Sequence, residues 1–275
     1  IAPDLTALAP HHCSIRPGAS IALHRHRYLS AMCLIALSYR THPRYPLVVA
    51  ANRDEFRDRP TQRAHFWPDA PEILAGRDLQ ALGTWLGIAR QGRFAAITNH
   101  RDLRKQQPNG PSRGALVREA LGQDIDPNTT DMYAGFNLLY GTLDALHYHN
   151  NIDGRAVAIT PGIHGLSNAF LNTPWPKVMR AKQRMEAVQQ RTGSDLVESL
   201  FALLADDAQA PDDLLPDTGL PLELERSASS IFIPNDVYGT RCSTVVLVND
   251  AGQVHFEERA LPDGHAVVER FQMAG

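Results

Sequence analysis

The chain has 275 residues and a formal net charge of −3, with 43% hydrophobic and 21% charged residues. These are ordinary values for a globular protein, and the nearly balanced charge argues against non-specific binding to nucleic acid. No segment approaches the ~18 consecutive apolar residues that a membrane-spanning helix requires.

The three cysteines, Cys13, Cys33 and Cys242, form no CxxC pair. Such a sparse, odd set is typical of a reducing compartment and of a protein without a disulfide framework. The histidines form no HExxH motif, so we expect no metal site. We therefore expect a soluble cytoplasmic protein that acts on a small molecule, with neither a nucleic-acid partner nor a membrane span. The oligomeric state stays open.

Residues 1–31 lack the pattern of a folded domain. They contain three prolines and four histidines, and show neither a helical nor a strand period nor the apolar segment of a signal peptide. Three origins remain open: a foreign or over-extended start, a propeptide removed by self-cleavage, and a native tail. We expect 1–31 to be a disordered or non-native extension and 32–275 to form a single domain.

Short apolar segments follow one another in pairs that are separated by turn-forming residues. Gln91-Gly92 between two such segments is typical of a hairpin turn. The expected strands are 33–38, 46–51, 83–89, 93–99, 136–141, 145–149, 156–160, 240–248 and 253–258. Helical periodicity predicts helices over 114–121, 176–190 and 195–205, and 209–221 is expected to be a surface loop.

Several predicted strands are apolar on both faces, for example 48–51 and 245–248. Hairpin connections imply antiparallel pairing, and an antiparallel strand that is buried on both faces must lie between two layers. The expected fold class is therefore α+β, a four-layer α-β-β-α sandwich of two antiparallel sheets.

Cys33 directly follows Met32 and opens the first predicted strand. If translation starts at Met32 and that residue is removed, Cys33 becomes the first residue. Its α-amine, with a pKa of ~7.7–8.0, can then take the proton of its own thiol, whose ordinary pKa is ~8.5. This pattern makes Cys33 the candidate nucleophile.

The second predicted strand runs into Asn52, Arg53 and Asp54, and a hairpin would bring this cluster close to Cys33. Asp54 would orient the α-amine, and Arg53 would stabilise a thiolate or bind an acidic substrate group. We take Asn52 and Arg53 as candidate substrate-binding residues. The alternative is a salt-bridged strand end without a functional role.

Three further polar residues lie at or near strand ends. Asn99 and Asn168 can donate hydrogen bonds to a developing oxyanion, although asparagines at strand ends also cap turns. Arg241 opens the last long strand, where an arginine needs a partner. It is expected either to be structural or to polarise the site.

Motifs spread over most of the chain occur together in a fixed order. They are Met32-Cys33, Asn52-Arg53-Asp54-Glu55, Arg59-Pro60, Ala75-Gly76-Arg77-Asp78, Gly83-Thr84-Trp85-Leu86-Gly87, Thr98-Asn99, Gly165-Leu166-Ser167-Asn168, Thr173-Pro174-Trp175 and Tyr238-Gly239-Thr240-Arg241. With these motifs the chain, over residues 32–260, resembles the NRDE family, also called the transport and Golgi organisation protein 2 family.

The resemblance implies the fold of the N-terminal nucleophile hydrolases, near the choloylglycine hydrolase and penicillin V acylase group. By position, Cys33 matches the nucleophile and Asp54 the acidic residue beside the terminal amine. Asn99 and Asn168 match the two asparagines of the oxyanion site, and Arg241 matches a late-strand arginine. Eukaryotic members are linked to Golgi organisation, lipid metabolism and haem trafficking without an agreed reaction.

Two hypotheses for the function follow. The first is an N-terminal cysteine amidohydrolase or acyltransferase that acts on a small linear amide and needs no cofactor. The alternative is a non-catalytic carrier of haem or another hydrophobic ligand, in which Cys33 would be an axial thiolate and Arg53 or Arg241 a propionate partner. A fold retained for protein interaction is the third reading.

Overall fold

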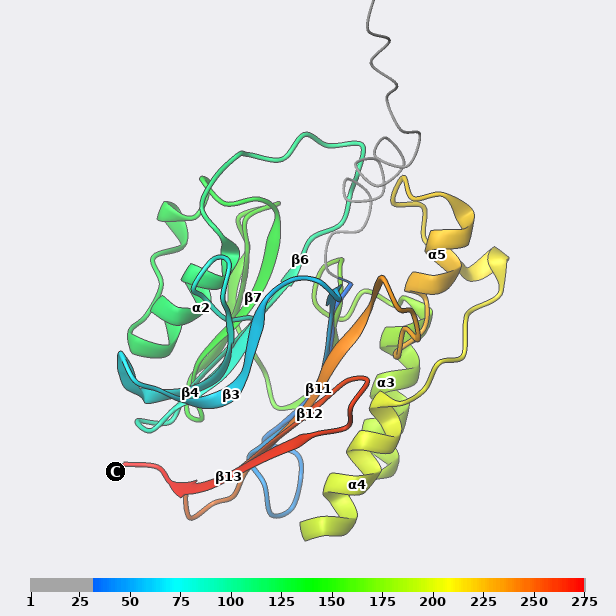
Figure 1. The fold of residues 1–275 in the computed structure, drawn as a ribbon. Helices are drawn as coiled ribbons and strands as arrows, with labels where there is room; N and C mark the ends of the chain where they lie inside the picture. Colours follow the sequence, from blue (N-terminus) through cyan, green and yellow to red (C-terminus); the bar gives the residue numbers. More distant parts are fainter. Residues whose placement is uncertain (1–31, 275) are drawn as a thin grey trace, which may run out of the picture.

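The computed structural model describes residues 32–274, and the predictions for 1–31 lie outside the described residues. Two antiparallel sheets pack face to face, with helices on their outer faces (Figure 1). The predicted α-β-β-α sandwich is therefore confirmed.

The first sheet has six strands in the order β10-β1-β2-β11-β12-β13, and all neighbouring strands are antiparallel. Its strands are β1 (Leu34–Tyr39), β2 (Leu47–Phe56), β10 (Gly162–Leu166), β11 (Tyr238–Val248), β12 (Gln253–Ala260) and β13 (Ala266–Gln272). Helices α3 (Pro176–Ala187) and α4 (Gly193–Leu204) cover the outer face, and α5 (Leu222–Ala228) lies near one end of this layer (Figure 1).

The second sheet has seven strands that follow the chain order from β3 to β9. Its strands are β3 (Thr61–Trp67), β4 (Ala70–Asp78), β5 (Leu86–Ala89), β6 (Arg93–Asn99), β7 (Phe136–Thr142), β8 (Leu146–Asn150) and β9 (Ala156–Ala158). Helix α2 (Arg113–Gly122) packs on its outer face through Leu116, Val117 and Ala120.

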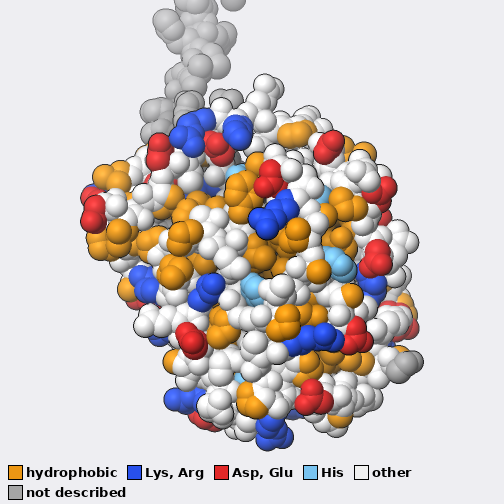
Figure 2. Space-filling view, turned by 180° about the vertical axis from the view of Figure 1, so that it is seen from behind, with side chains coloured by type: hydrophobic (Ala, Val, Ile, Leu, Met, Phe, Trp, Pro, Cys, Tyr) orange, Lys and Arg blue, Asp and Glu red, His pale blue; other side chains and the backbone are white. Residues whose placement is uncertain are grey.

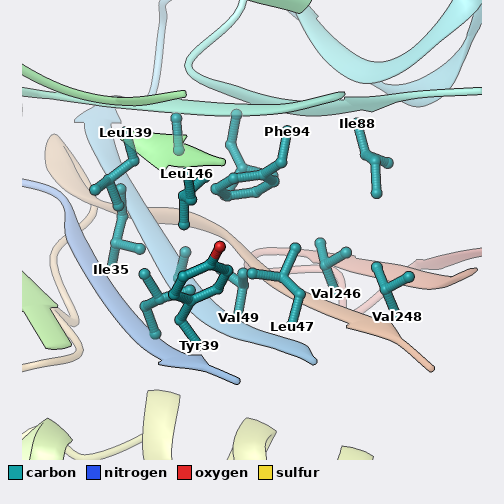
Figure 3. Close-up of a cluster of buried hydrophobic side chains, with 14 of the residues drawn as sticks. Ile35, Tyr39, Leu47, Val49, Ile88, Phe94, Leu139, Leu146, Val246 and Val248 are labelled. Carbon is teal, nitrogen blue, oxygen red and sulfur yellow. The ribbon is translucent and has the colours of Figure 1, made fainter. Parts of the chain in front are cut away.

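The central core fills the space between the two sheets, as Figure 3 shows. Ile35, Val49 and Val246 point up from the first sheet toward Phe94 and Leu139 of the second. Residues one position along each strand point the other way, into a second core beneath α3 and α4. This alternation explains why the strands are apolar on both faces.

Hydrophobic side chains are interspersed with charged side chains of both signs on the face shown in Figure 2. The large hydrophobic residues that are exposed, such as Leu82, Met132 and Val237, come from separate segments. Among residues 32–274, no helix is both long and apolar enough to cross a bilayer.

Candidate active site

A cleft of about 840 Å³ opens where the ends of the two sheets meet. Cys33 contributes from the segment just before β1, Arg53 from the first sheet, Asn99 from the second, and Arg113 from the start of α2. The structure thus brings four residues from separate parts of the chain to one cavity.

Cys33 lies immediately before β1, and the residue is only 3% exposed. Its Sγ atom is 4.0 Å from the backbone oxygen of Asp54, and its own carbonyl oxygen accepts a hydrogen bond of 2.9 Å from the Ser167 hydroxyl. Burial, reinforced by the Asp54 carboxylate, raises the pKa of the Cys33 thiol to about 12. The thiol is therefore protonated at neutral pH while the nitrogen of Cys33 is in a peptide bond with Met32.

Strand β2 divides its polar residues between its two faces. Arg53 and Glu55 line the cleft, whereas Asn52 and Asp54 lie on the other side, toward the helices. The Asn52 amide donates hydrogen bonds to two backbone carbonyls, and its oxygen accepts one of 2.7 Å from Ser243. Asn52 therefore supports the layer behind the cleft and does not line it.

Asp54 is fully buried behind Cys33. Its Oδ1 atom accepts a hydrogen bond of 2.7 Å from Thr240, while Oδ2 has no hydrogen-bond partner among the described residues. Burial raises the pKa of the Asp54 carboxyl, and the positive charge of Lys177 opposes that rise. A buried carboxylate with a free oxygen is ready to accept one more hydrogen bond.

Two residues that the sequence did not single out for a role at the site, Tyr238 and Lys177, hold the backbone of Met32. The backbone nitrogen of Met32 donates a hydrogen bond of 2.7 Å to the Tyr238 hydroxyl, and Lys177 Nζ donates one of 2.9 Å to the Met32 oxygen. Lys177 is only 1% exposed, and burial lowers its pKa. Its place on α3 beside the buried Val178 was the available signal, but periodicity does not distinguish an exposed lysine from a buried one.

The two candidate oxyanion asparagines occupy different positions. Asn99 ends β6 and lines the cleft. Asn168 is fully buried behind it, and its amide donates a hydrogen bond of 3.0 Å to the Asn99 carbonyl. The loop that carries Asn168 also contacts β6 through Ser167. The backbone oxygen of Ser167 accepts a hydrogen bond of 2.5 Å from the Thr98 hydroxyl. The two sheets are thus tied together next to Cys33.

Arg241 lines the cleft, but its guanidinium is used within the protein. Its Nη1 atom donates to the carbonyl oxygens of Phe56, Arg57 and Arg59 at 2.6, 2.9 and 3.0 Å. Its Nη2 atom donates to the Thr61 hydroxyl at 3.0 Å. These contacts fasten the connection between β2 and β3, which favours the structural alternative for Arg241.

Cys242, a buried residue of β11, also lines the cleft. Burial raises its pKa well above the ordinary value, and the neighbouring Glu258 carboxylate adds to the rise. The structure therefore places two protonated thiols, Cys33 and Cys242, in one cavity. Within residues 32–274, no group of three or more His, Cys, Asp or Glu side chains is arranged to hold a metal ion.

Comparisons with known proteins agree with the motif series. The family model described as Transport and Golgi organisation 2 matches residues 32–263. The Transport and Golgi organization 2 homolog of Mus musculus is 36% identical over 260 residues, covering 84% of this chain and 94% of the relative. The corresponding human protein is 37% identical over 265 residues, with 84% and 94% coverage.

A crystal structure of a mutant conjugated bile acid hydrolase from Clostridium perfringens aligns with a TM-score of 0.49 and 7% identity. The alignment covers 89% of this chain and 92% of the hydrolase chain.

Proposed function

The chain belongs to the Transport and Golgi organisation 2 family, and from the geometry of its cleft we propose that it is an N-terminal cysteine hydrolase or acyltransferase acting on a small linear amide. In this proposal the active form begins at Cys33. The same proposal places the protein in the cytoplasm, where both described cysteines would stay reduced.

The proposed reaction has two steps. The Cys33 thiol gives its proton to the α-amine, and its sulfur attacks the carbonyl carbon of the amide. The C–N bond then breaks as the leaving amine takes the proton, which leaves an acyl thioester on Cys33. Water or a second amine attacks the thioester and releases an acid or a new amide. The side chain of Asn99, which faces the cleft, is the candidate oxyanion donor, and Asn168 positions it.

One observation carries the proposal: Cys33 faces the cleft while Asp54 lies behind its backbone, with one carboxylate oxygen that has no hydrogen-bond partner within residues 32–274. The Tyr238 hydroxyl contacts both the Met32 nitrogen and the Asp54 backbone oxygen, so the three residues form one cluster. A terminal ammonium at Cys33 would supply the hydrogen-bond donor that Asp54 Oδ2 lacks among the described residues. Met32 is absent from that form, so Lys177 would lose the backbone oxygen that accepts its hydrogen bond. It would remain beside the positively charged amine of Cys33.

The lining of the cleft favours an amide over haem, the ligand of the alternative carrier function. Among the described residues that line the cleft, Trp85 is the one aromatic residue, and most of the others have polar or charged side chains. A haem macrocycle needs extended apolar contact on both of its faces. If haem nevertheless shows a Soret shift that is lost in Cys33→Ala, the carrier function replaces the proposed one.

The test compares two forms of the protein, one starting at Met32 and one starting at Cys33. Each is treated with iodoacetamide, and labelling of Cys33 and Cys242 is followed by peptide mass spectrometry. We expect rapid labelling of Cys33 only in the form that begins with it, because only that form has the internal base. Cys242 is the control within the same cleft. Equal labelling rates for the two cysteines in both forms would refute the proposal.

A further inference from the structure

The charged side chains that line the cleft are not balanced. Six arginines face four acidic residues. The arginines are Arg53, Arg59, Arg63, Arg77, Arg113 and Arg241, and the acidic residues are Glu55, Asp78, Glu258 and Asp263. An excess of positive charge in a concave site concentrates anions there, so the question is which arginine is available to a ligand.

Two of the arginines share the same carboxylates. Arg59 lies 2.6 Å from Asp78 and 3.7 Å from Glu55, and Arg53 lies 3.7 and 3.8 Å from Glu55 and Asp78. This cluster of two arginines and two acids is internally neutral. A ligand anion would have to compete with carboxylates that are already in place.

Three more arginines are also engaged. Arg63 pairs with Asp263 at 2.5 Å, and Arg77 makes two hydrogen bonds, of 2.6 and 2.8 Å, to Asp69. Arg241 is held by backbone carbonyls, as described above. None of the three can turn to a ligand without losing these contacts.

Arg113 differs from the other five. Its Nη1 atom donates a hydrogen bond of 3.0 Å to the Gly135 carbonyl, and no acidic side chain among residues 32–274 forms an ion pair with it. Burial lowers its pKa to about 10, so it stays charged at neutral pH. It is also close enough to Cys33 for a thiolate there to raise its pKa.

We propose that Arg113 binds a carboxylate of the substrate, so that the substrate class is a linear amide that also carries a carboxylate group. This inference rests on the proposed function and narrows it. A guanidinium offers parallel N–H groups that match the two oxygens of a carboxylate. A single charge is favoured over a phosphate dianion because Arg113 supplies one positive charge and Glu258 lines the same cleft.

The binding test uses Cys33→Ala protein, so that no reaction interferes. Glutaramate, which carries one amide and one carboxylate, is compared with the uncharged glutaramide by titration calorimetry or NMR. We expect glutaramate to bind at least about tenfold more tightly, the equivalent of one charge-assisted hydrogen-bonded pair. Adding Arg113→Gln should remove the preference, whereas Arg118→Gln, an exposed arginine on the same helix that does not line the cleft, should retain it.

Equal affinity for the two probes, or a preference that survives Arg113→Gln, overturns the inference. If Arg113→Gln does not fold, Arg113→Lys provides the test, because an ammonium cannot make the paired contact and the preference should fall. A phosphonate analogue that binds more tightly than glutaramate also overturns the carboxylate assignment. The proposed reaction is tested independently by the labelling of Cys33, because this titration requires no nucleophile.

Discussion

The ammonium group of Lys177 donates a 2.9 Å hydrogen bond to the backbone oxygen of Met32, while its charge faces the carboxylate of Asp54. Both side chains are buried. Burial raises the pKa of the Asp54 carboxyl and lowers the pKa of the Lys177 ammonium, so it favours the neutral form of each group. The attraction between them therefore does not repay the loss of hydration. Buried groups that cost stability are typical of functional sites, and this pair lies directly behind Cys33.

The Asp54 carboxyl should make the protein less stable as pH rises. Its folded-state pKa is raised to about 6 from the ordinary value of 3.8, so the folded state binds the proton more tightly than the unfolded state does. Its contribution to the free energy of unfolding therefore falls between pH 3.8 and about 6, by at most about 3 kcal/mol. The variant Asp54→Asn lacks this titration but can still accept the hydrogen bond from Thr240.

Urea unfolding across this pH window measures the effect. The stability of Asp54→Asn relative to the wild type should grow with pH and level off once Asp54 is ionised. A difference that does not change with pH would mean that burial leaves the carboxyl at its ordinary pKa, and a shrinking difference would mean that its pKa is depressed.

Removing Lys177 should move the titration of Asp54 upward. The charge of Lys177 is the largest influence that opposes the effect of burial on Asp54. In Lys177→Met, the stability difference produced by Asp54→Asn should therefore keep growing to a pH above that seen in the wild-type background. Lys182→Met on the same helix is the matched control, because Lys182 contacts Asn172 instead. An unchanged window in Lys177→Met would show that the two groups do not interact.

We expect the replacement of Arg241 to lower the stability of the fold rather than to act directly on the reactivity of Cys33. The Arg241 guanidinium satisfies three carbonyl oxygens at the start of the β2–β3 connection. Arg241→Met removes a donor from each of these oxygens, although the Phe56 oxygen keeps the hydrogen bond of 3.2 Å from the Arg59 N–H, and we expect the free energy of unfolding to fall by about 2–4 kcal/mol in urea titrations. Arg63→Met, which breaks only a half-exposed ion pair, should cost less than about 1 kcal/mol. If Arg241→Met unfolds like the wild type but loses Cys33 labelling, Arg241 acts on the chemistry.

The layers of the fold could be predicted from the sequence because strands buried on both faces are apolar at every position, as in 48–51 and 245–248. The sequence was insufficient for β3 and β4, where polar and apolar residues mix, and for the edge strands β10 and β13, which are short or largely exposed. Strands β3, β10 and β13 lie at sheet edges, and a sheet edge buries less of each residue.

The placement of the candidate site residues was predicted in part. A hairpin does bring Arg53 and Asp54 to Cys33, but proximity along a strand does not say which face each side chain takes. That face depends on the register, in which Leu34 pairs with Asn52. Arg113 and Lys177 lie far from Cys33 in the chain, and only the folded structure brings them to it. The position of Lys177 beside Val178 on α3 is a local signal, but it does not show that the lysine is buried next to Cys33.

The two thiols of the cleft should not form a disulfide with each other. Cys242 pairs with Arg53 on one side of β2, and Cys33 precedes β1, which pairs with the other side. Two strand spacings separate their Cα atoms by about 9–10 Å, and a disulfide requires less than about 7 Å. Mild oxidation of protein starting at Met32, followed by mass spectrometry without reduction, should therefore show no Cys33–Cys242 cross-link.

Arg53→Cys in a Cys33→Ser background is the control, because it places a cysteine directly opposite Cys242 and should cross-link. A Cys33–Cys242 bond at the same rate as in this control would mean that the strands slide past one another in solution, which would undo the register on which the site is built.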